Sequence, residues 1–258
     1  MYISVIIITF NEERNILRCI KSVSEVADEI LVIDSFSTDK TVEICKSLNT
    51  KVLQREFKGY GDQKRYATEQ AKYDVILSLD ADEELSETLI ESIKKIKINT
   101  AFDCFSFDRN NLYCNKSIKF CGWAPDKQIR LYNRQLVNWN TKEVHESIEV
   151  SKDHRIMHLE GVLNHYTCQT IAEHQKKEKK YAEINGQILA KKGRKIIYFT
   201  PHLKGGFRFI KTYVLKLGLL DGHYGFVISK TLAKSSYTKY KTARNSHNKF
   251  KSLQKKQK

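Results

Sequence analysis

Two aspartates separated by one residue, Asp80 and Asp82, follow a short apolar run at positions 75–79. A run of this length rich in Val, Ile and Leu is typical of a buried strand in a parallel sheet. Ligands of open α/β sheets bind beyond the carboxyl ends of the strands, so both carboxylates are expected at the mouth of a site. Mg²⁺ and Mn²⁺ prefer oxygen ligands, and Mg²⁺ often adds substrate phosphates. The spacing therefore predicts a metal-diphosphate site, although an isolated Asp-x-Asp is also typical of an acidic turn before a helix.

Polar side chains also close the first two apolar runs of the chain. Thr9, Asn11 and Glu12 follow the first run, and Asp34 ends the second. Carboxylates at these positions can accept hydrogen bonds from a nucleobase imide and from ribose hydroxyls, while Asn11 is also expected to cap the next helix. Neither a Gly-x-Gly-x-x-Gly nor a P-loop motif is present, so dinucleotide and P-loop sites lose their main support. Three polar strand ends on one sheet edge favour a nucleotide site.

The elements that would position these residues alternate between strand and helix. Short apolar runs separated by amphipathic segments predict a doubly wound, mainly parallel α/β sheet with right-handed crossovers. After residue 102 the runs become shorter and a Gly-Trp-Ala-Pro segment interrupts them, which predicts a mixed edge to the sheet. We expect strands at 3–9, 29–34, 51–53, 75–79, 104–108, 129–132 and 144–150, and helices after Asn11, from Ser37, and at 61–71, 86–96, 170–190 and 207–220.

Composition and charge bound the class of protein. The 258 residues are 41% hydrophobic, which is sufficient for one large α/β domain with an extension. The six cysteines form no Cys-x-x-Cys pair and are expected to be reduced thiols of a cytosolic protein. We expect no transmembrane helix and no signal peptide. Residues 184–258 carry 18 Lys and Arg and a single acid, Asp221. Residues 1–183 carry 27 Lys and Arg and 29 Asp and Glu. Such a basic end points to nucleic acid or an anionic membrane.

The segments 5–13, 32–41 and 79–83 form three motifs, which resemble those of the family 2 glycosyltransferases, whose fold is of the GT-A type. Later segments at 122–131, 144–146 and 220–225 are similar to those of the lipopolysaccharide-core β-1,4-glucosyltransferases. Phe36 departs from the pattern, because many relatives have Gly there, and a Phe leaves less room beside the nucleotide. The three motifs are Val5-Ile6-Ile7-Ile8-Thr9-Phe10-Asn11-Glu12-Glu13, Val32-Ile33-Asp34-Ser35-Phe36-Ser37-Thr38-Asp39-Lys40-Thr41 and Leu79-Asp80-Ala81-Asp82-Glu83.

The resemblance implies an inverting transfer of a hexose, with UDP-glucose as the expected donor, to a lipopolysaccharide or lipooligosaccharide core or a related phosphorylated glycolipid. It implies Mg²⁺ or Mn²⁺ held by Asp80 and Asp82, with His165 completing the metal site or contacting the diphosphate. Lys64 and Arg65 would add positive charge beside the diphosphate or the nucleotide. The alternative interpretation is that Lys64 and Arg65 lie on a solvated helix face and contact no ligand.

Direct displacement at the anomeric carbon needs a base for the acceptor proton and a cation for the departing diphosphate. We assign the base to Glu146, with Asp126 as the rival. Trp123 and His145 are assigned to the acceptor, Trp123 by stacking on a sugar ring. A core aromatic is the equally simple interpretation of Trp123.

The expected domains are a GT-A domain at 1–200, an amphipathic helical membrane-associating region at 201–240 and a basic, disordered tail at 241–258. The enzyme would be peripheral on the cytoplasmic face of the bacterial inner membrane, with no nucleic acid as a partner. One alternative is a sugar-phosphate nucleotidyltransferase, which is expected to carry a Gly-rich basic loop after its first strand. Another is a non-catalytic nucleic-acid-binding protein that uses the basic C-terminus, which requires exposed aromatics among the basic residues.

Overall fold

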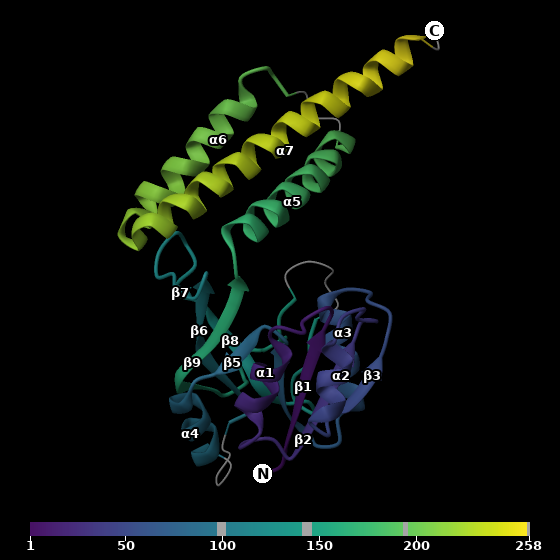
Figure 1. The fold of residues 1–258 in the computed structure, drawn as a ribbon, viewed down its shortest axis with the longest axis vertical. Coiled ribbons are helices and arrows are strands. Elements are labelled where there is room, and N and C mark those ends of the chain that lie inside the picture. Colours follow the sequence, from purple (N-terminus) through teal and green to yellow (C-terminus); the bar gives the residue numbers. More distant parts are fainter. Residues whose placement is uncertain (97–101, 141–145, 193–195, 257–258) are drawn as a thin grey trace. The chain divides into compact units, whose positions relative to one another are not determined.

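The computed structural model describes residues 1–96, 102–140, 146–192 and 196–256, with side chains described through residue 246 (Figure 1). The chain divides into two compact units. Unit 1 comprises Met1–Asn110 and Asp126–His165, and unit 2 comprises Asn111–Pro125 and Tyr166–Lys258.

Unit 1 is built on a mixed sheet with the strand order β3-β2-β1-β4-β8-β6-β9-β5 (Figure 1). The first four strands are parallel, β8 runs antiparallel to β4 and β6 antiparallel to β8. This confirms the predicted α/β sheet, in which β3, β2, β1 and β4 form the parallel part and the remaining strands form a mixed edge. The strands are β1 (Ile3–Thr9), β2 (Glu29–Asp34), β3 (Lys51–Gln54), β4 (Val75–Asp80), β5 (Glu83–Leu85), β6 (Cys104–Tyr113), β8 (Lys127–Asn133) and β9 (Ile156–Cys168), of which β6 and β9 continue past the unit boundary.

The sheet curls, and the path of the chain explains why. β5 begins three residues after the end of β4, yet three strands separate the two in the sheet order. Four inter-strand steps span about 19 Å in a flat sheet, whereas the chain from Asp80 to Glu83 reaches at most about 11 Å. β8, β6 and β9 must therefore wrap around so that β5 returns beside the end of β4. Residues of all these strands consequently surround positions 80–83.

Helices cover both faces of this sheet. All seven residues of β1 are buried, which is typical of a strand covered on both sides. Ile3, Val5 and Ile7 pack into one core with residues of α1, α2 and α4, whereas Ile6 and Ile8 pack into a second core with residues of α3. The helices are α1 (Ile16–Val23), α2 (Thr41–Ser47), α3 (Tyr60–Gln70) and α4 (Glu87–Ile96).

Unit 2 is mainly helical. Its helix α5 begins with a capping box, in which the Thr170 side chain accepts a hydrogen bond from the Glu173 amide and the Glu173 side chain accepts one from the Thr170 amide. Glycines allow close helix contacts: a Cβ atom at Gly186 would lie 2.7 Å from the Lys239 carbonyl oxygen of α7. The elements are β7 (Lys116–Ser117), α5 (Ile171–Lys191), α6 (Thr200–Ile210), the π-helical turn η1 (Lys211–Leu215), the 3₁₀ turn η2 (Gly218–Asp221) and α7 (Gly222–Lys256).

Several elements differ from the sequence-based predictions. The helix expected at 207–220 is divided into the end of α6, η1 and η2, because Leu217 is left-handed (φ 52°) and Gly218 is enclosed by the Cys121 side chain and the Thr212 carbonyl. α7 includes residues 241–256, where the composition predicts disorder. From the strand expected at 144–150, the described residues form only an isolated bridge between Ile148 and Trp139. Within the described chain, no helix combines the length and apolar character needed to span a membrane.

Candidate functional site

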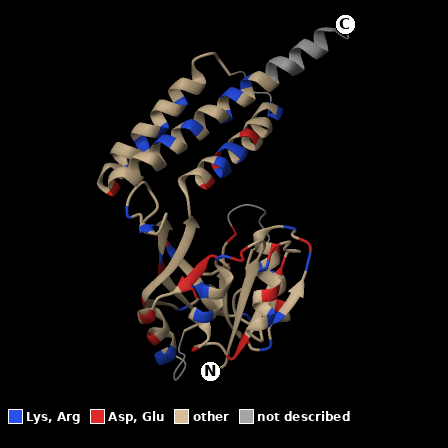
Figure 2. Ribbon diagram, in the orientation of Figure 1, with Lys and Arg blue, Asp and Glu red and all other residues tan. Residues whose placement is uncertain are grey.

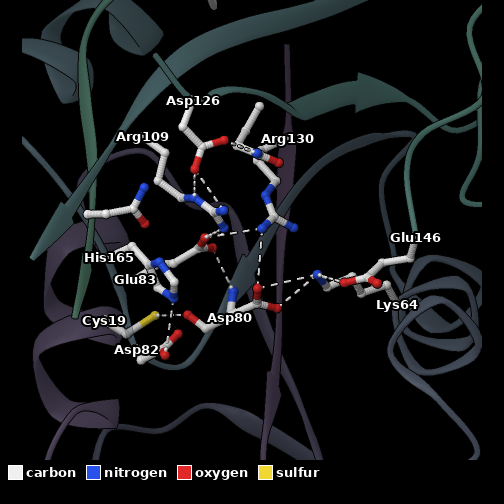
Figure 3. Close-up of polar contacts among 12 residues, drawn as sticks. Cys19, Lys64, Asp80, Asp82, Glu83, Arg109, Asp126, Arg130, Glu146 and His165 are labelled. Atoms are coloured by element: carbon white, nitrogen blue, oxygen red, sulfur yellow. Dashed lines mark hydrogen bonds and ion pairs between the residues drawn. The ribbon is translucent and has the colours of Figure 1, made fainter. Parts of the chain in front are cut away.

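Asp80, the last residue of β4, lies between two cations (Figure 3). Its Oδ1 atom is 3.0 Å from Lys64 Nζ and its Oδ2 atom is 3.2 Å from Arg130 Nη2. The side chains of Lys64 and Arg130 are only 1% and 4% exposed. Burial alone would raise the pKa of Asp80, but Lys64 and Arg130 outweigh it and hold that pKa well below its ordinary value. Asp80 is therefore ionised throughout the physiological pH range.

Glu83, at the start of β5, links this cluster to β6 and β8. Its side chain is fully buried, and its Oε1 atom lies 3.1 Å from Arg130 Nη2 and 3.4 Å from Arg109 Nη1. Its Oε2 atom accepts a hydrogen bond of 2.9 Å from the Asp80 amide. The curl of the sheet is thus fixed by a carboxylate that contacts three strands. Because Glu83 is desolvated, each of these contacts replaces a lost interaction with water.

Asp126 lies on the far side of Arg109. Arg109 donates to its Oδ2 atom from Nε at 2.8 Å, and Gln128 Nε2 donates to its Oδ1 atom at 2.6 Å. The register explains the pairing: Asp108 lies opposite Lys127, so the next residue of β6 lies opposite Asp126. Both carboxylate oxygens of Asp126 are therefore held by donors.

Glu146 approaches the cluster from the segment that follows β8. Its Oε1 atom is 3.6 Å from Lys64 Nζ, and its side chain is 26% exposed. The neighbouring residue is anchored, since the Asn140 amide donates to the Ser147 carbonyl at 2.9 Å. Glu146 and Asp80 thus share Lys64 as a cation (Figure 3).

The ring of Trp139 makes cation–π contacts with the two buried cations, Lys64 and Arg130. Lys64 Nζ lies 4.7 Å and Arg130 Cζ 5.5 Å from the centre of its ring. The indole is 3% exposed and donates from Nε1 to the Tyr132 hydroxyl at 2.9 Å. This contact fixes the ring, and the ring limits where Lys64 and Arg130 can move.

Asp82 and His165 form a separate pair. The Asp82 Oδ2 and His165 Nε2 atoms are 3.4 Å apart, and the two side chains are 25% and 18% exposed. β5 and β9 pair with Glu83 opposite His165, which brings the imidazole beside the aspartate two residues after β4. An oxygen and an imidazole nitrogen at this separation fit two ligands of one divalent cation.

The three residues predicted as metal ligands do not form a three-ligand group. Asp80 faces Lys64 and Arg130, and the described part of the chain holds no group of three or more His, Cys, Asp or Glu side chains arranged for a metal. Asp82 and His165 nevertheless fit a cation such as Mg²⁺, which commonly takes few protein ligands and completes its shell with water and phosphate oxygens.

The loops after β1 and β2 are tied together. Asp34 is fully buried, and its Oδ2 atom accepts hydrogen bonds from the Ser37 amide at 3.0 Å and from Gln54 Nε2 at 3.1 Å. Asn11 is left-handed (φ 55°) and its amide oxygen accepts from the Thr38 amide at 2.8 Å. Asn11 is therefore not a helix cap, and α1 begins only at Ile16. Of the predicted nucleotide-binding residues, Thr9 and Asp34 lie opposite each other at the ends of β1 and β2.

The other predicted residues have varied surroundings. Thr9 is buried, with a hydroxyl that has no hydrogen-bond partner within the described residues, and the Glu12 amide donates to Thr41 Oγ1 at 2.8 Å. Arg65 is 44% exposed and pairs with Glu69 of its own helix at 3.7 Å. Phe36 is left-handed (φ 61°), a conformation that suits the Gly of its relatives, and its ring is 55% exposed.

Of the two residues assigned to the acceptor, only Trp123 can be placed. Trp123 belongs to unit 2, where its ring lies edge-on to Tyr113 and His174 with centroids 5.8 and 6.4 Å away. These contacts are those of a core aromatic. His145 lies outside the described residues.

Sequence reasoning missed four members of the site: Glu83, Arg109, Arg130 and Trp139. Arg130 carried a usable signal, because it is a charge between Ile129 and Leu131 in a predicted strand. A buried strand tolerates such a charge only when it is paired.

The chain is similar in sequence to known glycosyltransferases. The sequence model described as Glycosyl transferase family 2 matches residues 4–149. The chain is 35% identical over 242 residues to an uncharacterized glycosyltransferase of Rickettsia typhi, covering 88% of this chain and 81% of that protein. It is 33% identical over 99 residues to the lipopolysaccharide core biosynthesis glycosyltransferase LpsC of Rhizobium meliloti, covering 36% of each chain. The solved structure of S. aureus TarS 1–349 in complex with UDP has a TM-score of 0.48 and 16% identity, covering 96% of this chain and 92% of TarS.

Proposed function

Because the chain belongs to glycosyltransferase family 2, we propose that it transfers glucose from UDP-glucose, with inversion, to a saccharide hydroxyl of a lipopolysaccharide core or a related phosphorylated glycolipid. The curled mixed sheet with C-terminal helices is a GT-A-like fold. The partial likeness to LpsC supports the choice of acceptor class. Family membership removes the reason to propose a nucleotidyltransferase or a nucleic-acid-binding protein.

The observation that carries the proposal is the convergence on Lys64 of two carboxylates from distant segments, Asp80 at 3.0 Å and Glu146 at 3.6 Å. A displacement at an anomeric carbon requires charged groups of both signs within one small space, since a proton is accepted while a diphosphate departs. The cations hold Asp80 ionised, so its oxygens can accept hydrogen bonds from hydroxyl groups of the donor.

We assign the base to Glu146 rather than to Asp126. Both oxygens of Asp126 accept hydrogen bonds, from Arg109 and from Gln128, so taking a proton would disrupt a short ion pair. Glu146 has a longer contact of 3.6 Å with Lys64 and is partly exposed, which leaves it accessible to an acceptor hydroxyl. Asp126 then serves to hold Arg109 against Glu83.

Asp82 and His165 are the proposed ligands of Mg²⁺ or Mn²⁺. The cation would neutralise negative charge on the departing diphosphate. The chain's own contribution is to hold the Asp82 and His165 ligand atoms 3.4 Å apart, with Asp82 in the turn between β4 and β5 and His165 on β9. Thr9 and Asp34, at the ends of β1 and β2, and Asn11 and Glu12, in the loop after β1, are proposed to bind the nucleoside.

The test is a UDP-release assay over a panel of nucleotide sugars, with a lipooligosaccharide core as the acceptor. We expect UDP-glucose to give the fastest release, and a chelator to abolish it. Glu146→Gln should lower transfer by about 10²- to 10⁴-fold, because only proton acceptance is lost. Binding of UDP-glucose to that variant, measured by calorimetry, should be unchanged.

The matched variants are Asp126→Asn and Asp82→Asn. Asp126→Asn should retain transfer at any temperature at which it remains folded, and Asp82→Asn should lose the metal-dependent turnover. Full transfer by Glu146→Gln would assign the base to Asp126 instead. Release of UDP from no donor in the panel would contradict the proposal as a whole.

A further inference from the structure

One face of α6 and of the turns that follow it exposes large apolar side chains. Leu203, Phe207, Ile210 and Val214 recur every three or four residues, so they lie in a row along one side of the helix. Their exposed fractions are 67, 60, 53 and 47%. Single exposed apolar residues are ordinary, whereas a contiguous group marks an interaction surface. Leu215, Leu217, Leu219 and Leu220, at the end of η1 and in the turns after it, are exposed as well, and we call Leu203, Phe207, Ile210 and Val214 the α6 row.

The opposite side of α6 is fixed against α7. Gly205 is buried there, and a Cβ atom at this position would lie 3.2 Å from the Ala233 carbonyl oxygen and 3.3 Å from Tyr237 Cβ. Thr212 of η1 is also buried. Turning the α6 row inward would require breaking this close contact, so the row stays on the outer side of α6 among the described residues.

Positive charge runs along the flank of the α6 row. Lys204, Arg208 and Lys211 each follow a member of the row by one residue, and all three are exposed. α6 and η1 contain no acidic residue (Figure 2). Asp221, the single acid after residue 183, is bound within unit 2, because its two oxygens accept hydrogen bonds from the Lys119 and Phe120 amides at 3.0 and 2.9 Å. The surface is therefore apolar with a cationic border.

We propose that the α6 row docks onto an anionic lipid bilayer. The apolar side chains insert at the boundary between headgroups and acyl chains, while Lys204, Arg208 and Lys211 contact lipid phosphates. Charge favours lipid over a second copy of this chain, because a symmetric pair would bring two cationic borders together. The docking is independent of the proposed glycosyl transfer and can be measured without donor or acceptor.

The experiment is flotation of the full chain with vesicles of phosphatidylcholine alone or mixed with phosphatidylglycerol. The wild-type protein should float with the mixed vesicles, and less of it as salt is raised. The triple variant Leu203→Ser/Phe207→Ser/Ile210→Ser should lose this binding. The matched control is Ile184→Ser/Ile188→Ser on α5, which removes apolar side chains that are 44 and 49% exposed and should bind as the wild type does.

A series of charge-removing variants separates the electrostatic contribution to vesicle binding from the apolar one. Each of Lys204→Gln, Arg208→Gln and Lys211→Gln should weaken binding to the mixed vesicles about fivefold. Lys176→Gln and Lys180→Gln, at exposed lysines of α5, should have a smaller effect. Because all these positions are exposed, circular dichroism and thermal unfolding should be unchanged in every variant.

Three results would overturn the proposal. The first is the absence of wild-type flotation with mixed vesicles at low salt. The second is an equal loss of binding in the α6 and α5 apolar variants. The third is a wild-type dimer in analytical ultracentrifugation that the α6 triple variant converts to a monomer, with no vesicle binding by either, which would assign the row to a second copy of the chain.

Discussion

The centre of unit 1 and the centre of unit 2 are both buried and polar, but they contain different groups. Around Asp80 the buried side chains are ions, namely Lys64, Glu83 and Arg130. Around Tyr113 they are neutral: its hydroxyl lies 3.1 Å from His174 Nδ1, and the rings of Trp123 and Tyr224 lie edge-on to it. Removing ions from water is costly, and pairing seldom returns more than that cost. Stability alone therefore does not explain the ions of unit 1, which fit the proposed glycosyl transfer, whereas the neutral cluster of unit 2 requires no role beyond packing.

Burial acts on both clusters and has opposite outcomes. In unit 2 it raises the pKa of Tyr113 and lowers the pKa of His174, so both groups stay uncharged near neutral pH. In unit 1 burial also favours the neutral form of Asp80, but Lys64 and Arg130 reverse the result and lower its pKa. The partner ions, rather than the degree of burial, decide the protonation state.

Glu83→Gln should be the most destabilising change in this comparison. The substitution keeps the shape of the side chain but leaves Arg109 and Arg130 without their shared carboxylate. Breaking a buried ion pair from one side costs about 3–5 kcal/mol. Glu84→Gln is the matched control, because Glu84 is 25% exposed and its pair with Arg18 is 3.8 Å long, so a change below about 1 kcal/mol is expected.

The two tryptophans allow each unit to be followed alone. Trp139 lies in unit 1 and Trp123 in unit 2, and the chain has no other tryptophan. In a Trp123→Phe background, urea unfolding monitored by Trp139 fluorescence should show the loss caused by Glu83→Gln. An equal loss in the free energy of unfolding for Glu84→Gln would mean that the burial of the Glu83 ion pairs does not account for their contribution to stability.

Lys64→Met should have the next largest effect. It removes the cation shared by Asp80 and Glu146, although Arg130 still pairs with Asp80. Loss of hydrogen bonds to charged groups lowers the free energy of unfolding by about 1.5–3 kcal/mol. Arg65→Met, at the next position, should change it by less than about 0.5 kcal/mol because its pair with Glu69 is exposed. Both variants are measured by urea unfolding. Similar losses in the free energy of unfolding would show that the buried contacts of Lys64 with Asp80 and Glu146 do not stabilise the unit more than the exposed pair of Arg65 does.

The contrast between Lys64 and Arg65 shows where sequence reasoning ends. Both were predicted to contact the donor, and periodicity alone does not tell which of two adjacent basic residues faces the sheet. The strand ends were predictable, because a run such as β1 that is buried on both faces permits few alternatives. Glu83 and Arg130 were not, since the contact joins residues 47 positions apart. β5, only three residues long, is defined by its pairing with β9 rather than by a local pattern.

The choice between Glu146 and Asp126 illustrates the same limit. Asp126 follows the Trp123-Ala124-Pro125 segment and Glu146 belongs to the strand expected at 144–150, and the sequence supports either as the base. The distinction comes from partners: Arg109 and Gln128 hold Asp126, whereas Lys64 approaches Glu146 at a longer distance. Such partners come from other strands, and their register is set by the whole sheet.

Tyr113→Phe tests the neutral cluster with a smaller expected effect. The change removes the hydroxyl near His174 Nδ1 and keeps the ring contacts. A single neutral hydrogen bond contributes about 0.5–1.5 kcal/mol. In a Trp139→Phe background, urea unfolding monitored by Trp123 should show a loss of this size. A loss as large as that of Glu83→Gln would remove the energetic distinction between the two centres.

The smallest effect is a pH dependence of the stability of unit 2 that comes from His174. Burial lowers the pKa of His174 in the folded state, so below its ordinary value near 6.5 the unfolded chain binds more protons and the folded unit loses stability. For one group this loss is less than about 1 kcal/mol between pH 7 and pH 6. The lowered pKa of Asp80 places its own loss of stability below about pH 4, outside this interval. Unfolding monitored by Trp123 fluorescence at pH 7 and pH 6 should show a decrease in the free energy of unfolding for the chain with His174 and a smaller decrease for His174→Gln. Equal decreases in the two would show that His174 is not the titrating group.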